Sequence, residues 1–285
     1  MRLLLPAAAV MVLLLCAGCA GMPEASYHIG DAGDLTLEIP SPSVTETVLS
    51  RETNVTTSRI AMHGDTGDVY ALLSMPNNPV AGIVYAPGAG VTKEAHRERA
   101  ERYARSGIAF LVLDIRGNGG ETPGYPLDIA QDFALFTEGE WPQYYRIAGD
   151  LIAARKLLAE RTGVPVYTMG SSNGGRYAIL AAAADPDFAG AIGVSTSGFG
   201  LAGDQYAGDA RRFLNSIDPD CCIKRIAPRP VWIFHAESDE IIPYASGVSL
   251  YGRASDPKEF IAISGGHGIN GDVDAWMIAR LGANL

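Results

Sequence analysis

Cysteine is scarce in this chain of 285 residues, and its placement excludes some kinds of site. The four cysteines are Cys16, Cys19, Cys221 and Cys222. No group of cysteines and histidines has the short, regular spacing of a zinc site, so we predict no metal. A disulfide between adjacent cysteines closes a strained ring. The pair at 221 and 222 is therefore expected to consist of buried free thiols.

Features of nucleotide and nucleic-acid binding are also missing. Lys and Arg number 22 against 32 Asp and Glu, a formal net charge of −10, and they form no basic stripe, so nucleic acid is a poor partner. The Gly-x-Gly segments at 88–90 and 117–119 lack the third glycine of the dinucleotide pattern, because Lys93 and Thr122 stand there. No G-K-[ST] sequence exists. We predict no cofactor.

Long apolar runs are missing except at the start of the chain. Arg2 is followed by an apolar run to Gly18 that is too short for a comfortable membrane span, which is typical of a signal peptide over residues 1–18. Its end resembles a lipoprotein processing site, with Cys19 as the lipidated new N-terminus, although Cys16 stands where that pattern prefers Leu. The alternatives are ordinary cleavage nearby or an uncleaved anchor. All three predict an exported protein, either a membrane-anchored lipoprotein on the extracytoplasmic side or a secreted one.

Residues 19–44 are rich in Pro, Ser and acidic side chains, and we expect a tether. Residues 45–285 are expected to form one domain. Hydrophobic residues make up 47% of the chain and charged residues 19%, which allows a sizeable core.

The domain is predicted to be an α/β fold. It opens with three strands of an antiparallel meander at 45–52, 55–62 and 68–74. Further strands are expected at 82–86, 109–113, 164–169, 191–195, 230–235 and 260–264, and helices at 93–106, 146–161, 177–184 and 273–281. Alternating strands and helices predict a mostly parallel sheet covered by helices on both faces. An insertion at about 198–229 is predicted to form either a cap or packing helices.

A nucleophile elbow is the strongest motif in the sequence. The segment Gly170-Ser171-Ser172-Asn173-Gly174 matches G-x-S-x-G and lies between a predicted strand and a predicted helix. Glycine is needed at 170 and 174 because a side chain there would collide with the neighbouring strand or helix. Ser172 is the predicted nucleophile. The alternative is a Gly- and Ser-rich loop with no chemistry.

A serine nucleophile needs a base, and His267 is the best candidate. It lies in a glycine-rich loop directly after the last predicted strand, which can bring its imidazole over the elbow. His96 is expected on the solvated face of a helix. The orienting acid should also follow a strand, and Asp239 does so, with Glu237 and Glu240 as competitors. The chain order is then Ser172, Asp239, His267.

Together these segments resemble the α/β-hydrolase superfamily over about residues 55–285. The resemblance rests on the elbow, on Tyr85-Ala86-Pro87-Gly88-Ala89-Gly90, on Asp114-Ile115-Arg116-Gly117-Asn118-Gly119, and on the segments of the acid and the histidine. It implies an oxyanion hole formed by the backbone N–H groups of Ala89 and Asn173. The segment Ala86-Pro87-Gly88 departs from the His-Gly pattern of many members, which argues against the HGGG subgroup.

The resemblance is to the serine-peptidase-like and dienelactone-hydrolase-like branches. A dienelactone hydrolase would have cysteine where Ser172 stands, and residues 22–80 are too few for the propeller or large cap usual in the peptidases. We therefore expect a compact serine esterase that acts on small-molecule esters through an acyl-enzyme. The alternatives are a peptidase or amidase with the same triad, acting on short peptides, and a non-catalytic binding protein on this fold.

Overall fold

The computed structural model describes residues 24–283, so the predicted signal peptide and Cys19 lie outside the described residues. Within this part of the chain, one large sheet has the strand order β11-β10-β9-β8-β6-β7-β5-β4-β3. Its strands are β3 (Ser43–Arg51), β4 (Val55–His63), β5 (Val69–Pro76), β6 (Ala81–Ala86), β7 (Ile108–Leu113), β8 (Val166–Ser171), β9 (Ala191–Val194), β10 (Val231–Ala236) and β11 (Lys258–Ile263). The predicted strands are thus confirmed with small shifts of their ends.

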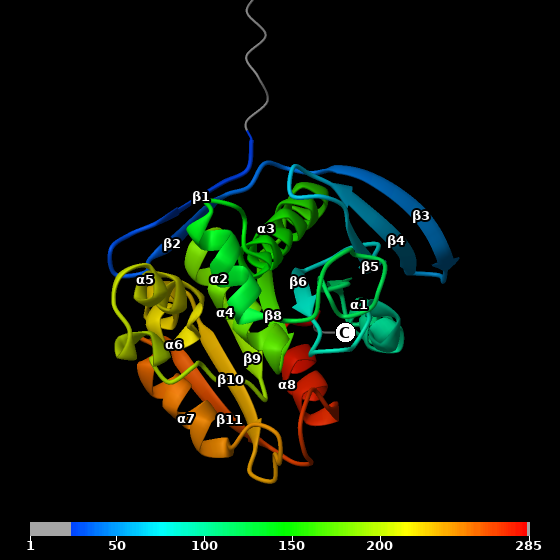
Figure 1. The fold of residues 1–285 in the computed structure, drawn as a ribbon. Coiled ribbons are helices and arrows are strands. Elements are labelled where there is room, and N and C mark those ends of the chain that lie inside the picture. The colour runs from blue at the N-terminus through cyan, green and yellow to red at the C-terminus, as the bar shows by residue number, and fades with distance from the viewer. Residues whose placement is uncertain (1–23, 284–285) are drawn as a thin grey trace, which may run out of the picture.

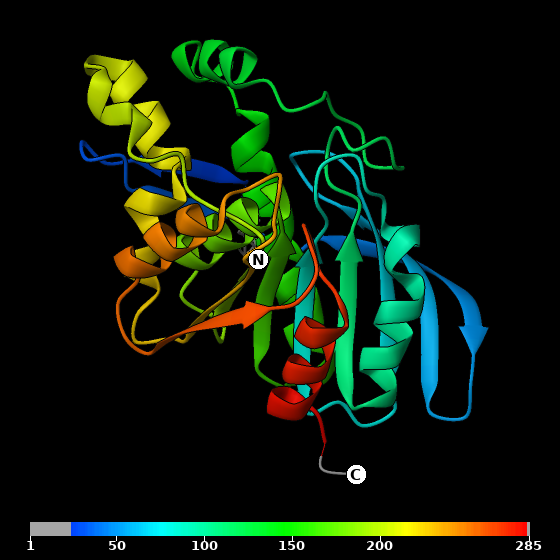
Figure 2. The ribbon, with the colours of Figure 1, turned by 90° about the horizontal axis from the view of Figure 1, so that it is seen from below.

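The sheet has the predicted mixture of strand directions. Strands β3, β4 and β5 form an antiparallel meander, and β5 pairs antiparallel with β7. Strands β6 to β11 pair with one another in parallel. Since parallel strands end at the same edge of a sheet, the loops that follow β6 to β11 gather at one edge (Figure 2).

Helices cover both faces of the sheet, as predicted (Figure 1). On one face, α1 (Arg97–Arg105) and α8 (Gly271–Leu281) bury residues such as Tyr103 and Met277 against the strands. On the other face lie α3 (Gln143–Thr162), α4 (Asn173–Ala184) and α7 (Tyr244–Arg253). No helix in residues 24–283 has both the length and the apolar character needed to cross a membrane.

The insertion forms short helices, and a helix that the sequence analysis missed packs against them. The insertion contains η2 (Ala202–Gln205), α5 (Gly208–Ile217), α6 (Pro219–Cys222) and η3 (Ile223–Ile226). The missed helix α2 (Ile129–Thr137) contacts α5 through Phe133 and Phe136, whose rings lie 5.7 and 5.4 Å from that of Phe213. In Figure 2, α2 (green) and α5 (yellow) project beyond the sheet on the side to which the parallel strands point.

The two cysteines of the insertion are free thiols, as expected. Cys222 is buried and Cys221 is partly buried. Burial raises the pKa of both thiols, to about 12 for Cys222 and about 11 for Cys221. Neither thiol is therefore ionised at neutral pH.

The expected tether is wrong for most of its length. Residues 26–38 form a second, two-stranded antiparallel sheet of β1 (Ser26–Ile29) and β2 (Leu35–Glu38), which lies across the helices at the top of Figure 1. Alternate side chains of this segment enter the main core, where Ile29, Leu35 and Leu37 are buried. The composition suggested a solvated linker, but the alternation of Leu35-Thr36-Leu37-Glu38 is that of a half-buried strand.

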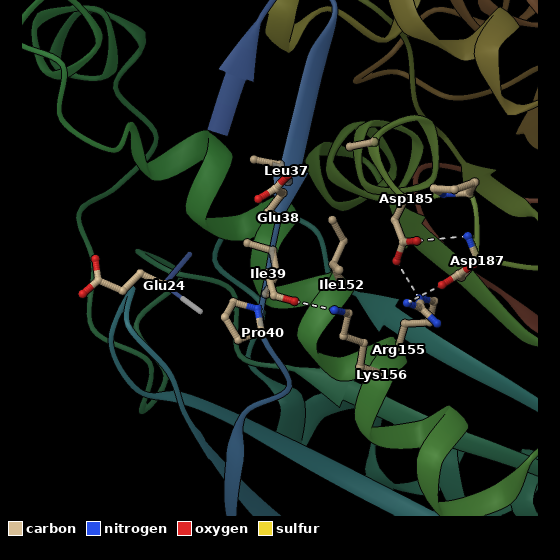
Figure 3. Close-up of a pocket in the computed structure, with 12 residues that line it drawn as sticks. Glu24, Leu37, Glu38, Ile39, Pro40, Ile152, Arg155, Lys156, Asp185 and Asp187 are labelled. Atoms are coloured by element: carbon tan, nitrogen blue, oxygen red, sulfur yellow. Dashed lines mark hydrogen bonds and ion pairs between the residues drawn. The ribbon is translucent and has the colours of Figure 1, made fainter. Parts of the chain in front are cut away.

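The chain after β2 is held on α3. Lys156 Nζ donates a hydrogen bond to the carbonyl oxygen of Ile39. A Cβ at Gly149 of α3 would lie 2.9 Å from Ile39 Cδ1, so the missing side chain of Gly149 makes room for Ile39. Figure 3 shows the cavity of about 380 Å³ beside this contact, lined by Leu37, Ile39, Pro40, Ile152, Arg155 and Lys156 among others.

Because Leu35 is fully buried, we expect Leu35→Ala to lower the free energy of unfolding by about 2–5 kcal/mol. The matched control is Val48→Ala on the exposed side of β3, with an expected cost below about 0.5 kcal/mol. Urea unfolding followed by fluorescence measures both. Equal, small effects of the two substitutions would mean that residues 24–42 are a tether after all.

Candidate active site

The elbow between β8 and α4 holds Ser172 in an unusual backbone conformation. Ser172 has φ 56° and ψ −124°, a region that residues with a side chain rarely adopt. The surrounding structure holds it there. Its N–H donates to Val194 O of the neighbouring strand at 2.9 Å, and its carbonyl accepts from Thr196 Oγ1 at 2.8 Å and from Gly175 N at 3.0 Å. Among residues 24–283, the hydrogen bonds of the His267 ring go to Asp239, and none joins His267 Nε2 to Ser172 Oγ.

The glycines of the elbow are needed for the reason that the sequence suggested. A Cβ at Gly170 would lie 2.1 Å from Gly174 O, and a Cβ at Gly174 would lie 2.0 Å from Ala86 O. Both atoms belong to backbone that cannot move aside. The first turn of α4 therefore packs directly on the ends of β6 and β8.

The loop after β6 lies beside Ser172. A Cβ at Gly88 would be 3.3 Å from Ser172 Cβ. Residues 88–91 form a turn closed by the hydrogen bond from Val91 N to Gly88 O, 3.2 Å, with Gly90 at φ 71°, as in a type II turn. Ala89, one of the two predicted oxyanion residues, occupies this turn. Asn173, the other, is the first residue of α4, where backbone N–H groups have no intrahelical acceptor.

Of the three candidate acids, the structure places Asp239 against His267. The Nδ1 atom of His267 lies 3.0 and 2.9 Å from the two carboxylate oxygens of Asp239. Since a carboxylate only accepts, Nδ1 carries a proton, and Nε2 is the acceptor of the neutral ring. Glu237 and Glu240 are exposed.

The Asp239 carboxylate is buried and accepts several hydrogen bonds from protein N–H groups. Its Oδ1 accepts from Ile241 N and Ile242 N, each at 2.9 Å. Burial by itself would raise the pKa of Asp239, but these two N–H groups and the imidazole of His267 outweigh it and lower the pKa below its ordinary value. Asp239 is therefore ionised at neutral pH.

The loop that carries His267 is fixed against the elbow. Gly268 N donates to Ser195 Oγ at 3.0 Å, and a Cβ at Gly268 would be 3.8 Å from Ser171 Oγ. Gly265 and Gly268 have φ 78° and 102°, so the glycines flanking the histidine allow the sharp turns that the sequence analysis expected. The side chain of His267 is 25% exposed.

Two supporting residues were missed. Ser195, at φ 47°, follows β9 and anchors the histidine loop through Gly268. His235, fully buried in β10, lies with Nε2 2.9 Å from Ile242 O and 3.3 Å from Asp239 Oδ2, and so supports the turn that carries the acid. The signal for Ser195 was its place at the end of the strand predicted over 191–195, at the same edge of the sheet as Asp239.

His96 is buried, so its expected position on a solvated face is wrong. Arg99 donates from Nη1 to His96 Nδ1 at 2.8 Å, and the ring of His96 packs edge-on against Tyr85 at 4.8 Å. Arg99 also pairs with Asp274 of α8 at 2.9 Å. Burial first, and the charge of Arg99 second, lower the pKa of His96 to about 4.

Comparison with known proteins agrees with this fold. The family description "Serine aminopeptidase, S33" matches residues 77–218. The uncharacterized protein YfhR of Salmonella typhi is 24% identical over 208 residues, which cover 68% of this chain and 66% of that protein.

Among solved structures, acetyl xylan esterase 1 from Thermoanaerobacterium sp. JW/SL YS485 has TM-score 0.67 at 16% identity over 84% of this chain and 88% of that one. The acetyl xylan esterase from Paenibacillus sp. R4 has TM-score 0.69 at 18% identity, with the same coverage. The sheet order, the elbow and these likenesses define the α/β-hydrolase fold. The likeness shows that the chain has this fold, and the matched family description covers just under half of the chain.

Because His96 must stay neutral in the folded protein, its protonation opposes folding. Between pH 6.5 and 4 the unfolded chain binds this proton and the folded chain does not, so stability falls as the pH falls through that window. From this residue we expect a loss of about 2 kcal/mol in unfolding free energy between pH 7 and pH 5.

Urea unfolding at the two pH values measures the loss. His96→Gln should remove most of this contribution, whereas His28→Gln, at an exposed position, should keep it. An unchanged pH dependence in His96→Gln would contradict the assignment.

Proposed function

We propose that this α/β-hydrolase is a serine esterase that cleaves carboxylic esters through an acyl-enzyme, with Ser172, His267 and Asp239 as its triad. One observation carries the proposal: the imidazole of His267 is held on the ionised Asp239, in a loop that packs against the strained turn of Ser172. Acyl transfer needs a serine hydroxyl, a base that can reach it, and a group that orients the base. The pairing of His267 with Asp239 supports the last of these roles.

In the proposed mechanism, Ser172 Oγ attacks the ester carbonyl while His267 Nε2 accepts its proton. Asp239 keeps the proton of the imidazole on Nδ1 and stabilises the imidazolium that forms. The N–H groups of Ala89 and Asn173 bind the oxyanion of the tetrahedral intermediate. His267 then protonates the departing alkoxide. Water, deprotonated by the same imidazole, hydrolyses the acyl-enzyme and restores the serine.

The names of the relatives favour esters and leave a second candidate. The two structural relatives reported above are acetyl xylan esterases, which supports ester cleavage. The family description names a serine aminopeptidase, which supports a peptidase or amidase with the same triad. Amides have poorer leaving groups, so this reaction depends more strongly on proton donation by His267.

We also propose that the protein is exported and that Cys19 carries a lipid. The support is the pattern of residues 1–19. If Cys19 is the anchor, only residues 20–23 separate it from the described part of the domain. A segment of this length reaches at most roughly 15 Å. The domain would then lie close to a membrane surface.

The triad is tested by substitution, with turnover of short p-nitrophenyl esters as the readout. We expect Ser172→Ala and His267→Ala to lower kcat by about 10³-fold or more, and Asp239→Asn by about 10³–10⁴-fold. Glu237→Gln and Glu240→Gln, which alter the exposed neighbours of the acid, are the matched controls and should stay within about threefold of the wild type. Substantial activity of purified Ser172→Ala would exclude this serine as the nucleophile.

The choice between ester and amide is tested on paired substrates. The two substrates are an acyl p-nitrophenyl ester and the p-nitroanilide of the same acyl group. We expect the ester-to-anilide ratio of kcat/KM to exceed the ester-to-anilide ratio of the uncatalysed hydrolysis rates. Aminoacyl p-nitroanilides cleaved with the higher kcat/KM would instead establish the peptidase.

A further inference from the structure

We propose that Asn118 is a positioning residue that holds the oxyanion turn in its active geometry. The inference rests on the proposed function, because it concerns how the N–H of Ala89 is aimed at the reacting carbonyl. Asn118 belongs to the loop after β7 and lies far from Ser172 in the sequence.

The side-chain amide of Asn118 donates hydrogen bonds to both ends of the turn at residues 88–91. Its Nδ2 donates to Gly88 O at 2.9 Å and to Val91 O at 3.1 Å. Two carbonyl acceptors fix which side of the amide faces the turn, since only the NH₂ group can donate to both. Gly88 O also accepts from Val91 N, so Asn118 reinforces the bond that closes the turn.

The turn needs such support because little else holds it. Ala89 and Gly90 are exposed, and Gly88 and Gly90 contribute no side chain that could pack. Glycine also raises the conformational freedom of the turn. An oxyanion donor acts by being in place before the charge develops, and displacement by a fraction of an ångström weakens it.

Asn118 is itself held rigidly. Its N–H donates to Ile115 O at 3.0 Å, and Gly117 and Gly119 on either side have φ 81° and 86°. A Cβ at Gly117 would lie 1.9 Å from Tyr125 O, so only glycine at 117 allows the two backbone segments to pack this closely.

The same loop holds the chain again just beyond the turn. The buried carboxylate of Asp114 accepts from Lys93 N at 2.9 Å, from Lys93 Nζ at 2.5 Å and from Glu121 N at 3.0 Å. Lys93 is buried, and its ammonium also contacts Glu94 and Glu121 at 2.7 Å. The loop 114–121 therefore binds the segment 88–93 at two places, through Asn118 and through Asp114. The contact of Asn118 is the one nearer to Ala89 in the sequence.

The test compares Asn118→Ala and Asn118→Ser with the wild type in ester hydrolysis. We expect kcat to fall about 10- to 100-fold in Asn118→Ala, somewhat less than on removing an oxyanion donor outright, with KM within about threefold. Asn118→Ser keeps one donor and should lie between. Asn77→Asp and Asn77→Ala, at an exposed asparagine whose amide donates only to Thr53 O at 3.5 Å, are the controls and should match the wild type.

A second readout separates positioning from general destabilisation. A trifluoromethyl ketone forms a tetrahedral adduct with the serine and places an oxyanion in the hole. We expect its inhibition constant to rise in Asn118→Ala by about the factor by which kcat/KM falls, with the melting temperature lowered by only a few degrees. An inhibition constant that stays at the wild-type value, or a kcat within twofold of the wild type, would overturn the role of Asn118.

The failure of the proposed function would look different. In that case the wild type itself would neither hydrolyse the ester nor bind the ketone, and the role given to Asn118 would fall with it.

Discussion

The active-site edge of the sheet depends on a close contact between backbone segments at the junction of β8 and α4. Gly170 and Gly174 let the first turn of the helix pack on the ends of β6 and β8 at distances that no side chain permits. That contact forces Ser172 to φ 56° and projects the residue from the edge of the sheet. The cost of this conformation, of order 1–3 kcal/mol, is offset by the hydrogen bonds of Ser172 to Val194, Gly175 and Thr196.

The other parts of the site are loops after parallel strands that converge on this point. The loop after β11 carries His267, the turn after β10 carries Asp239, and the turn after β6 carries Ala89. Two of them are held by a polar side chain from a neighbouring loop: Ser195 holds the histidine loop, and Asn118 holds the turn of Ala89. The turn of Asp239 is supported by His235 of β10. The sheet thus sets the approximate positions, and short polar contacts fix the final ones.

The sequence allowed this edge to be predicted because its signals are local. Glycines around Ser172 and polar residues directly after apolar strands identify the elbow, the histidine and the acid without knowledge of distant contacts. The choice of Asp239 over Glu237 and Glu240 agrees with the structure, in which only the carboxylate of Asp239 is turned inward onto His267.

What the sequence could not predict depends on distant partners. Residues 24–42 have the composition of a linker, yet Ile29, Leu35 and Leu37 enter the core, and Ile39 lies against α3, more than 100 positions later in the chain. Helix α2 is held by Phe133 and Phe136 against Phe213 of the insertion, about 80 positions later in the chain. His96 lies on a helix with many charged residues, but Tyr85 and Arg99 enclose it.

The central claim, an activated serine at the elbow, is tested most directly by labelling with a fluorophosphonate and locating the adduct by peptide mass spectrometry. Ser171 provides an internal control, because it is adjacent, buried and bears the same functional group. We expect a single adduct on Ser172 that is lost in His267→Ala. An adduct on Ser171, or no labelling of the folded wild type, would contradict it.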